Sequence, residues 1–134
     1  MSQPIGHHLR CVTEEFAPTP SSVPATRGFV GRFFRDAGAS TDTIDTAQLC
    51  VSEAATNAIR HTGLDYTVTC TALDDGRIAV EVRDQDPRSS PLRRHPADDD
   101  ENGRGLELLD ALAEWHVTTT ATGKTLAFVL KEDR

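Results

Sequence analysis

The stretch LCVSEAATNAIRHT, residues 49–62, joins an apolar helical stripe to polar residues that stand four apart, Glu53, Asn57 and His61. At about 100° per residue, the apolar residues between Ile44 and Ile59 fall on one side of a predicted helix, with Glu53 and Asn57 roughly opposite. This spacing has two interpretations. The polar side chains are either the solvated side of a packed helix, which is the commoner case, or a set of ligands carried on one helix.

Length and composition indicate a single globular domain, residues 1–134, with 37% hydrophobic residues. The net charge of −7 argues against non-specific binding to nucleic acids or to anionic membranes. Cys11, Cys50 and Cys70 are odd in number and widely separated, which favours reduced thiols over a disulfide framework. The N-terminus lacks the apolar core of a signal peptide, and no run approaches membrane-spanning length. We therefore expect a cytoplasmic protein.

Periodicity and turn residues predict alternating strands and helices. The predicted strands are 10–17, 66–73, 77–84, 116–122 and 125–131. The predicted helices are 25–38, a long helix that follows residue 41 or 42 and ends at Gly63, and 105–115. Thr41 or Asp42 can cap the long helix, and Gly63 can end it in a left-handed turn. The sequences DDG and GK are predicted hairpin turns. This order predicts an α+β protein, a two-layer α/β sandwich with helices on one face of a largely antiparallel mixed sheet.

A long polar segment, residues 85–103, has no periodic pattern and separates two informative ends. Asp84 closes the strand before it, and Gly103 and Gly105 open the helix after it. Glycines at a helix N-terminus let backbone amides approach an anion such as a phosphate, although glycines also commonly break a loop before a helix. A segment of this length in a small domain is a lid, a binding loop or a disordered stretch.

These features resemble, in order and spacing, the Bergerat ATP-binding fold of the GHKL superfamily, the histidine kinase-like ATPases. The resemblance is carried by EAATNAIRH (residues 53–61), by the strand-ending Asp84, by the long segment and by GRGL (residues 103–106). It extends from about residue 10 to residue 131 and is strongest with the small bacterial branch of anti-sigma-factor serine/threonine kinases. Each motif alone is weak, and their joint spacing is specific.

The resemblance implies a magnesium-dependent catalytic side on the long helix. Asn57 corresponds to the family's Mg²⁺ ligand, and Glu53 corresponds to the residue that acts as general base. A neutral Asn oxygen can hold Mg²⁺ while phosphates and waters complete the metal's shell. A carboxylate one helical turn away can take the proton of an incoming hydroxyl. His61 is given no catalytic role.

The resemblance also implies an ATP-binding pocket. Asp84 corresponds to the carboxylate that accepts the adenine amino group, and Thr125 to a hydroxyl on the late strand that supports the adenine site. The phosphate-binding box comprises Gly103, Arg104, Gly105 and Leu106, next to a flexible ATP lid at about 87–102. The arginines of this region either neutralise triphosphate or balance the acidic residues 98–101; they are Arg88, Arg93, Arg94 and Arg104.

The function implied is an ATP- and Mg²⁺-dependent serine/threonine protein kinase that is also an anti-sigma factor. It would phosphorylate an anti-anti-sigma protein of the STAS type and bind a sigma factor. The resemblance also suggests a homodimer, with no direct nucleic-acid or membrane binding. Two alternatives stay open: a non-catalytic ATP-binding module that sequesters a partner, and a protein that binds no nucleotide. The second arises because Asp86 stands where the family has glycine, and a side chain there would crowd the base.

Overall fold

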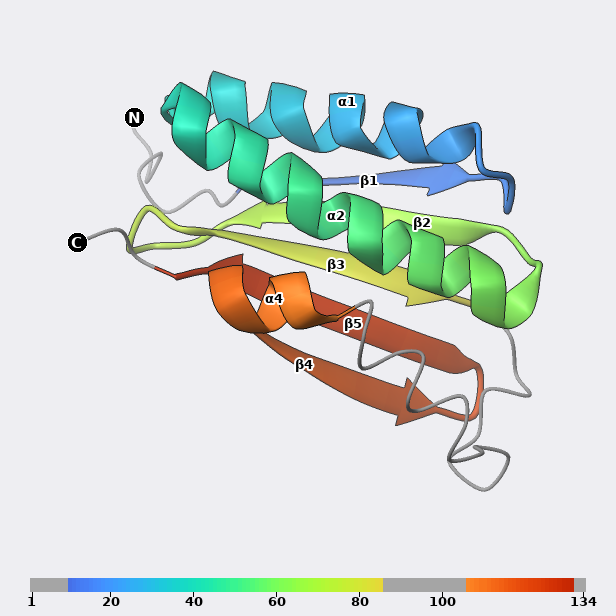
Figure 1. The fold of residues 1–134 in the computed structure, drawn as a ribbon. Helices are drawn as coiled ribbons and strands as arrows, with labels where there is room; N and C mark the ends of the chain where they lie inside the picture. Colours follow the sequence, from blue (N-terminus) through green and yellow to red (C-terminus); the bar gives the residue numbers. More distant parts are fainter. Residues whose placement is uncertain (1–9, 86–105, 132–134) are drawn as a thin grey trace, which may run out of the picture.

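In the computed structural model, which describes residues 10–85 and 106–131, a layer of helices covers one face of a five-stranded sheet (Figure 1). The elements are β1 (Cys11–Phe16), α1 (Ser22–Asp36), α2 (Thr41–Thr62), β2 (Tyr66–Ala72), β3 (Ile78–Asp84), α4 (Glu107–Leu112), β4 (Ala113–Thr120) and β5 (Gly123–Leu130). They follow the predicted order. The expected α+β sandwich is therefore confirmed.

Strand pairing places β3 in the middle of the sheet. The strand order is β1-β2-β3-β5-β4, and each pairing among the described strands is antiparallel. The prediction of a largely antiparallel sheet is confirmed, and no parallel pair occurs within these residues. After β3, the chain passes through α4 to form β4 at the edge of the sheet, and it then returns as β5 between β4 and β3. Because β3 and β5 are antiparallel, the end of β3 meets the start of β5.

The core lies between the sheet and the helices, and it follows from two periodicities. In β3, Ile78, Val80 and Val82 alternate toward the helices, as a strand period of two requires. In the helices, apolar residues at a spacing of three and four turn inward to meet them. Val30 of α1 and Val51 of α2 are fully buried. The predicted apolar face of α2 is therefore confirmed.

The long helix α2 begins and ends with residues suited to those positions. Ser40, rather than the predicted Thr41 or Asp42, is the N-cap, and its hydroxyl accepts a hydrogen bond from the Thr43 amide at 3.1 Å. Gly63 ends the helix in the left-handed conformation, with φ of 66°, as predicted. A helix of 22 residues is about 33 Å long, so α2 crosses the sheet from one end to the other (Figure 1).

Two helix boundaries differ from the predicted ones. α1 begins at Ser22 instead of residue 25, since Pro24 lies in the first turn, where the N–H that proline lacks has no helical partner. α4 ends at Leu112 instead of residue 115. Trp115 instead pairs with Phe128 of β5, and its Nε1 donates to Asp110 Oδ1 of α4 at 2.7 Å.

The last hairpin also turns at a different place. Thr120 pairs with Gly123, so the turn residues are Ala121 and Thr122 rather than the predicted Gly123 and Lys124. Lys124 therefore lies within β5.

The three cysteines differ in how far they are buried. Cys50 of α2 and Cys70 of β2 are buried, whereas Cys11 of β1 is exposed, and all are free thiols. Burial, and to a lesser degree the charge of Glu53, raises the pKa of Cys50 to about 11. Burial, and to a lesser degree Cys11, raises the pKa of Cys70 to about 12. Because the thiolate is the reactive species, neither buried thiol is nucleophilic near neutral pH.

Iodoacetamide at pH 8 should therefore modify the native chain at Cys11 alone, and should modify Cys50 and Cys70 only in denaturant. A thiol whose pKa lies about three units above the solution pH is ionised in about one molecule in a thousand. Mass spectrometry of tryptic peptides identifies the modified positions, and native Cys11→Ser, as the control, should stay unmodified. Native modification of Cys50 or Cys70 at a rate close to that of Cys11 would contradict this burial.

Candidate functional site

Asp84 and the C-terminal half of α2, which carries Glu53 and Asn57, lie at one end of the molecule. β3 ends at Asp84, and β5 begins beside it at Gly123. α2 packs on β3 and on α4, and its C-terminal half lies over this end of the sheet (Figure 1). Sheet and helix therefore contribute to one region.

Asp84 is a buried carboxylate in a row of residues on the helix side of the sheet. Only 2% of its surface is exposed, and its cross-strand neighbours are Tyr66 of β2 and Lys124 of β5. The backbone N–H of Lys124 donates to Asp84 Oδ1 at 3.2 Å. Burial of a carboxylate is costly unless hydrogen bonds compensate for it, and such groups concentrate at functional sites. Asp84 is thus held in place as a hydrogen-bond acceptor.

Gly123 allows β5 to approach the end of β3 closely. Its φ of +156° is rare for residues with a side chain, and a Cβ here would overlap the carbonyl oxygen of Asp84 and crowd the backbone of Gln85. Glycine has no Cβ and tolerates both conditions. In the sequence, Gly123 indicated only a turn, and its contact with Asp84 was missed.

Glu53 and Asn57 lie on the flank of α2 that faces away from α1. Gln48 and Ser52 mark the α1 side, because Gln48 Nε2 donates to the Arg27 carbonyl at 3.0 Å and Arg27 Nη1 donates to Ser52 Oγ at 3.2 Å. At about 100° per residue, Asn57 lies about 160° around the helix from these two residues. α2 lies between α1 and α4 (Figure 1), so this flank faces the α4 side.

Both side chains stand at the border between core and surface. Glu53 and Asn57 are half-buried, and four residues correspond to about 6 Å along the helix axis. The charge of Glu53 contributes to the raised pKa of Cys50, so this carboxylate lies close to the edge of the core. His61, the third member of the row, is exposed. The row is therefore not the fully solvated side of α2.

Thr125 does not lie beside Asp84. Alternation along β5 directs its side chain to the sheet face that the helices leave uncovered. Lys124 instead pairs with Asp84 and is in phase with the buried Leu126, so its side chain lies on the helix side. The position expected to carry a supporting hydroxyl therefore carries a lysine. The phase of Leu126 and Phe128 in the sequence was the available signal for this residue.

Most of the predicted phosphate-binding box lies outside the described residues. Leu106 directly precedes α4 and is buried. The remaining candidates are not among the described residues and stay predictions: Gly103, Arg104, Gly105, Asp86 and the lid at about 87–102 with its arginines.

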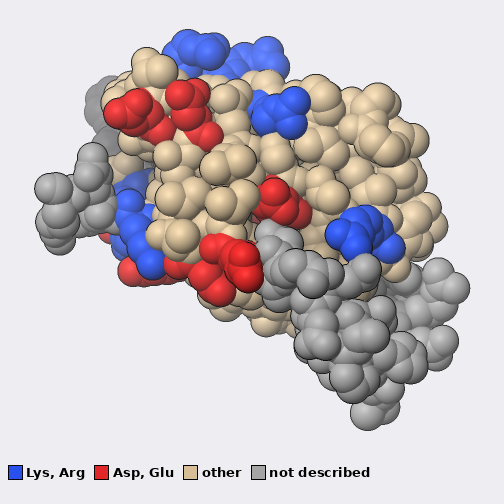
Figure 2. All heavy atoms as spheres, viewed as in Figure 1, with Lys and Arg blue, Asp and Glu red and all other residues tan. Residues whose placement is uncertain are grey.

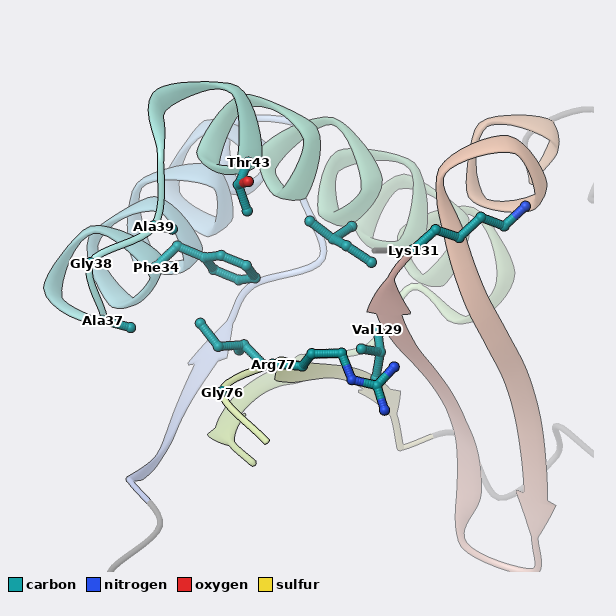
Figure 3. Close-up of a pocket in the computed structure, with 11 residues that line it drawn as sticks. Phe34, Ala37, Gly38, Ala39, Thr43, Gly76, Arg77, Val129 and Lys131 are labelled. Carbon is teal, nitrogen blue, oxygen red and sulfur yellow. The ribbon is translucent and has the colours of Figure 1, made fainter. Parts of the chain in front are cut away.

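A separate cavity of about 290 Å³ opens at the opposite end of the sheet (Figure 3). Its walls include Phe34 of α1, Val129 of β5, and Arg77 and Ile78 at the start of β3. Ile78 begins the strand that Asp84 ends, and a strand of that length spans about 20 Å. This cavity is therefore not part of the Asp84 region.

Acidic and basic side chains are interspersed on the face of the molecule that carries the helices (Figure 2). Among the described residues, this face shows acidic side chains between the basic ones rather than one basic surface of the kind that neutralises nucleic-acid phosphates. Within residues 10–85 and 106–131, no helix combines the length and the apolar character needed to cross a membrane.

Comparison with known families identifies the domain. The family model described as a histidine kinase-like ATPase domain matches residues 16–130. The chain belongs to this family. The match includes Glu53, Asn57, Asp84 and the whole of β5, and it confirms the resemblance to the GHKL superfamily.

Individual relatives place the chain more narrowly. The serine-protein kinase RsbW of Staphylococcus epidermidis is 30% identical over 112 residues, which cover 72% of this chain and 70% of that protein. An uncharacterised protein of Streptomyces coelicolor is 48% identical over 71 residues, which cover 50% of this chain and 68% of that protein. The similarity to RsbW confirms the small serine-kinase branch of the superfamily.

A solved structure supports the fold. The structure of the RsbU and RsbW domains of Rv1364c from Mycobacterium tuberculosis matches with a TM-score of 0.69 at 19% identity. The match covers 91% of this chain and 32% of that one, so this chain spans about a third of the solved chain. At this identity the likeness concerns the fold alone.

Proposed function

We propose that this chain is an ATP- and Mg²⁺-dependent serine/threonine protein kinase that binds a sigma factor and phosphorylates an anti-anti-sigma protein of the STAS type. One observation carries the proposal: buried Asp84 and half-buried Asn57 and Glu53 occupy one end of a histidine kinase-like ATPase domain. The similarity to a serine-protein kinase favours a protein hydroxyl as the acceptor. The proposed partners follow from this branch of the family.

The donors and acceptors in this region fit a magnesium nucleotide. Asp84 offers a desolvated carboxylate that can accept a hydrogen bond from the exocyclic amine of the base, and Gly123 leaves the backbone beside it uncrowded. Asn57 offers a neutral amide oxygen, which is a hard ligand. Mg²⁺ bound with nucleotides keeps several phosphate and water ligands, so a single ligand from α2 is sufficient.

Different residues of the chain act on the two ends of the nucleotide, the base and the γ-phosphate. Bound Mg-ATP supplies the γ-phosphoryl group and the metal charge that stabilises its transfer. Asp84 orients the base, so that the phosphates extend toward the α2 flank. Glu53 accepts the proton of the attacking serine or threonine hydroxyl, while the oxygen–phosphorus bond to the acceptor forms and the bond to the β-phosphate oxygen breaks.

A non-catalytic ATP-binding module that sequesters its partner is the alternative function. It would use the same Asp84 and Asn57, and it would differ in the role of Glu53. The half-buried position of Glu53 on the same flank of α2 as Asn57 favours the kinase, because it places a carboxylate one helical turn from the proposed metal ligand. Phosphate transfer to a bound partner separates the two functions.

Asn57→Ala should raise the Kd for ATP in the presence of Mg²⁺ by at least about tenfold. Removing a residue that only supports a metal ligand already costs about 10–100-fold in metal affinity, and removing a ligand itself should cost no less. Binding in EDTA should change little, because Asn57 lies outside the buried stripe of α2. Isothermal titration calorimetry measures both affinities. Thr56→Ala, at an exposed neighbouring position, is the matched control. Equal Mg²⁺-dependent affinities of wild type and Asn57→Ala would remove Asn57 as the ligand.

Glu53→Gln should lower the rate of phosphate transfer by on the order of 10²–10⁴, because the amide keeps the size of the side chain and cannot accept the proton. The affinities for ATP and for the protein partner should change little. Transfer of radiolabelled phosphate from ATP to an anti-anti-sigma protein measures the rate, in single turnover at saturating ATP.

Glu81→Gln is the control for this experiment, because Glu81 is exposed and pairs with Thr69 and Ala127 on the uncovered face of the sheet. It should transfer phosphate at the wild-type rate. A wild-type rate for Glu53→Gln would exclude Glu53 as the base. If the wild-type chain transfers no phosphate to a partner that it binds, the non-catalytic module is the correct function.

A further inference from the structure

Lys124 is a second charged residue beside the buried carboxylate of Asp84. The two residues are direct cross-strand partners in β3 and β5, and paired residues of this kind have Cβ atoms about 4.5–5.5 Å apart. The Lys124 amide is tied to Asp84 Oδ1 at 3.2 Å, and the lysine itself is half-buried. Its side chain starts on the helix side of the sheet, in phase with buried Leu126 and Phe128.

An ordinary surface lysine has a different setting. The other lysine of the chain, Lys131, is exposed at the far end of β5, where its ammonium group donates to the Asp110 carbonyl at 2.9 Å. Lys124 is half-buried directly beside Asp84. It can therefore contact the same part of a bound ligand as that carboxylate.

The two side chains have complementary hydrogen-bonding chemistry. An ionised carboxylate only accepts hydrogen bonds, and a protonated lysine only donates them. Adenine carries an amino donor at its 6-position, whereas guanine carries an oxygen acceptor there and N–H donors beside it. A site with a carboxylate alone therefore favours adenine and repels the oxygen of guanine. A site with both groups has a partner for either base.

We propose that Lys124 broadens the base selectivity of the site, so that the chain binds GTP as well as ATP. This inference rests on the proposed nucleotide-dependent function and extends its substrate class to purine nucleoside triphosphates. With guanine, Lys124 donates to the 6-oxygen and Asp84 accepts from the ring N–H. With adenine, Asp84 accepts from the amino group and Lys124 is dispensable. Lys124 is thus a specificity-determining residue.

Isothermal titration calorimetry with ATP and with GTP, both in Mg²⁺, tests the role of Lys124. The wild-type Kd values should agree within about tenfold, and Lys124→Thr should raise the Kd for GTP by about 10–100-fold, the worth of one hydrogen bond to a charged group. The Kd for ATP should change by less than about threefold, because the amino group of adenine is bound by Asp84. Lys124→Arg keeps a charged donor and should keep GTP binding.

Two control variants and one further measurement on Lys124→Thr make the outcome specific. Lys131→Thr removes the lysine at the far end of β5 and should leave both affinities at their wild-type values. Asp84→Asn should raise the Kd for both nucleotides, because each base donates a hydrogen bond to that carboxylate. Thermal melting of Lys124→Thr should show a folded chain, since Lys124 stands outside the apolar core.

The outcomes also distinguish this inference from the function on which it rests. If wild type binds ATP but binds GTP more than about a hundredfold more weakly, as a single-base site would, Lys124 does not broaden selectivity. An equal loss of affinity for ATP and GTP in Lys124→Thr would also overturn the inference, because it would show that the lysine acts on the phosphates or on the fold. If the wild-type chain binds neither nucleotide, the proposed function fails together with the inference.

Discussion

The close approach of β5 to the end of β3 is the constraint on which the candidate site depends. Gly123 presents no Cβ to the Asp84 carbonyl, and the next amide along the strand donates to the Asp84 side chain. The strand pair itself therefore orients a carboxylate that is otherwise costly to bury. The same register places Lys124 on the helix side and Thr125 on the uncovered side. A slip of one residue in the pairing of β3 with β5 would exchange the two, so this register determines which side chain lies beside Asp84.

The candidate site also depends on how α2 is rotated about its own axis. A contact with α1, on the side of α2 opposite Glu53 and Asn57, contributes to this rotation. Gln48 Nε2 occupies the space that a Cβ at Gly31 would fill and donates to the Arg27 carbonyl. α1 and α2 approach closely at this point, and a polar side chain rather than an apolar one fixes their register. With that flank fastened to α1, the flank with Glu53 and Asn57 is directed toward α4. The contact is remote from the site and still decides which residues reach it.

The sequence predicted the parts of this arrangement that periodicity encodes. The strand that Asp84 closes and the apolar stripe on the buried side of α2 were both predicted. It failed where two local signals compete. Both GK and the preceding residues can form a hairpin turn, and only pairing across the sheet chooses between them. Thr125 was matched by its residue type rather than by its phase with Leu126 and Phe128, so Lys124 was missed.

The proposed base-binding residue Asp84 and the proposed proton acceptor Glu53 stand on different elements, β3 and α2. On this proposal, a change at Lys124 of β5 affects the identity of the bound nucleotide, while Glu53 and Asn57 keep their places on α2. A departure from the family pattern near the base is therefore no argument against catalysis. Nor does it favour a protein that binds no nucleotide. Asp84 is 2% exposed and accepts a hydrogen bond from the Lys124 amide, so the fold holds a hydrogen-bond acceptor where the proposed nucleotide site needs one.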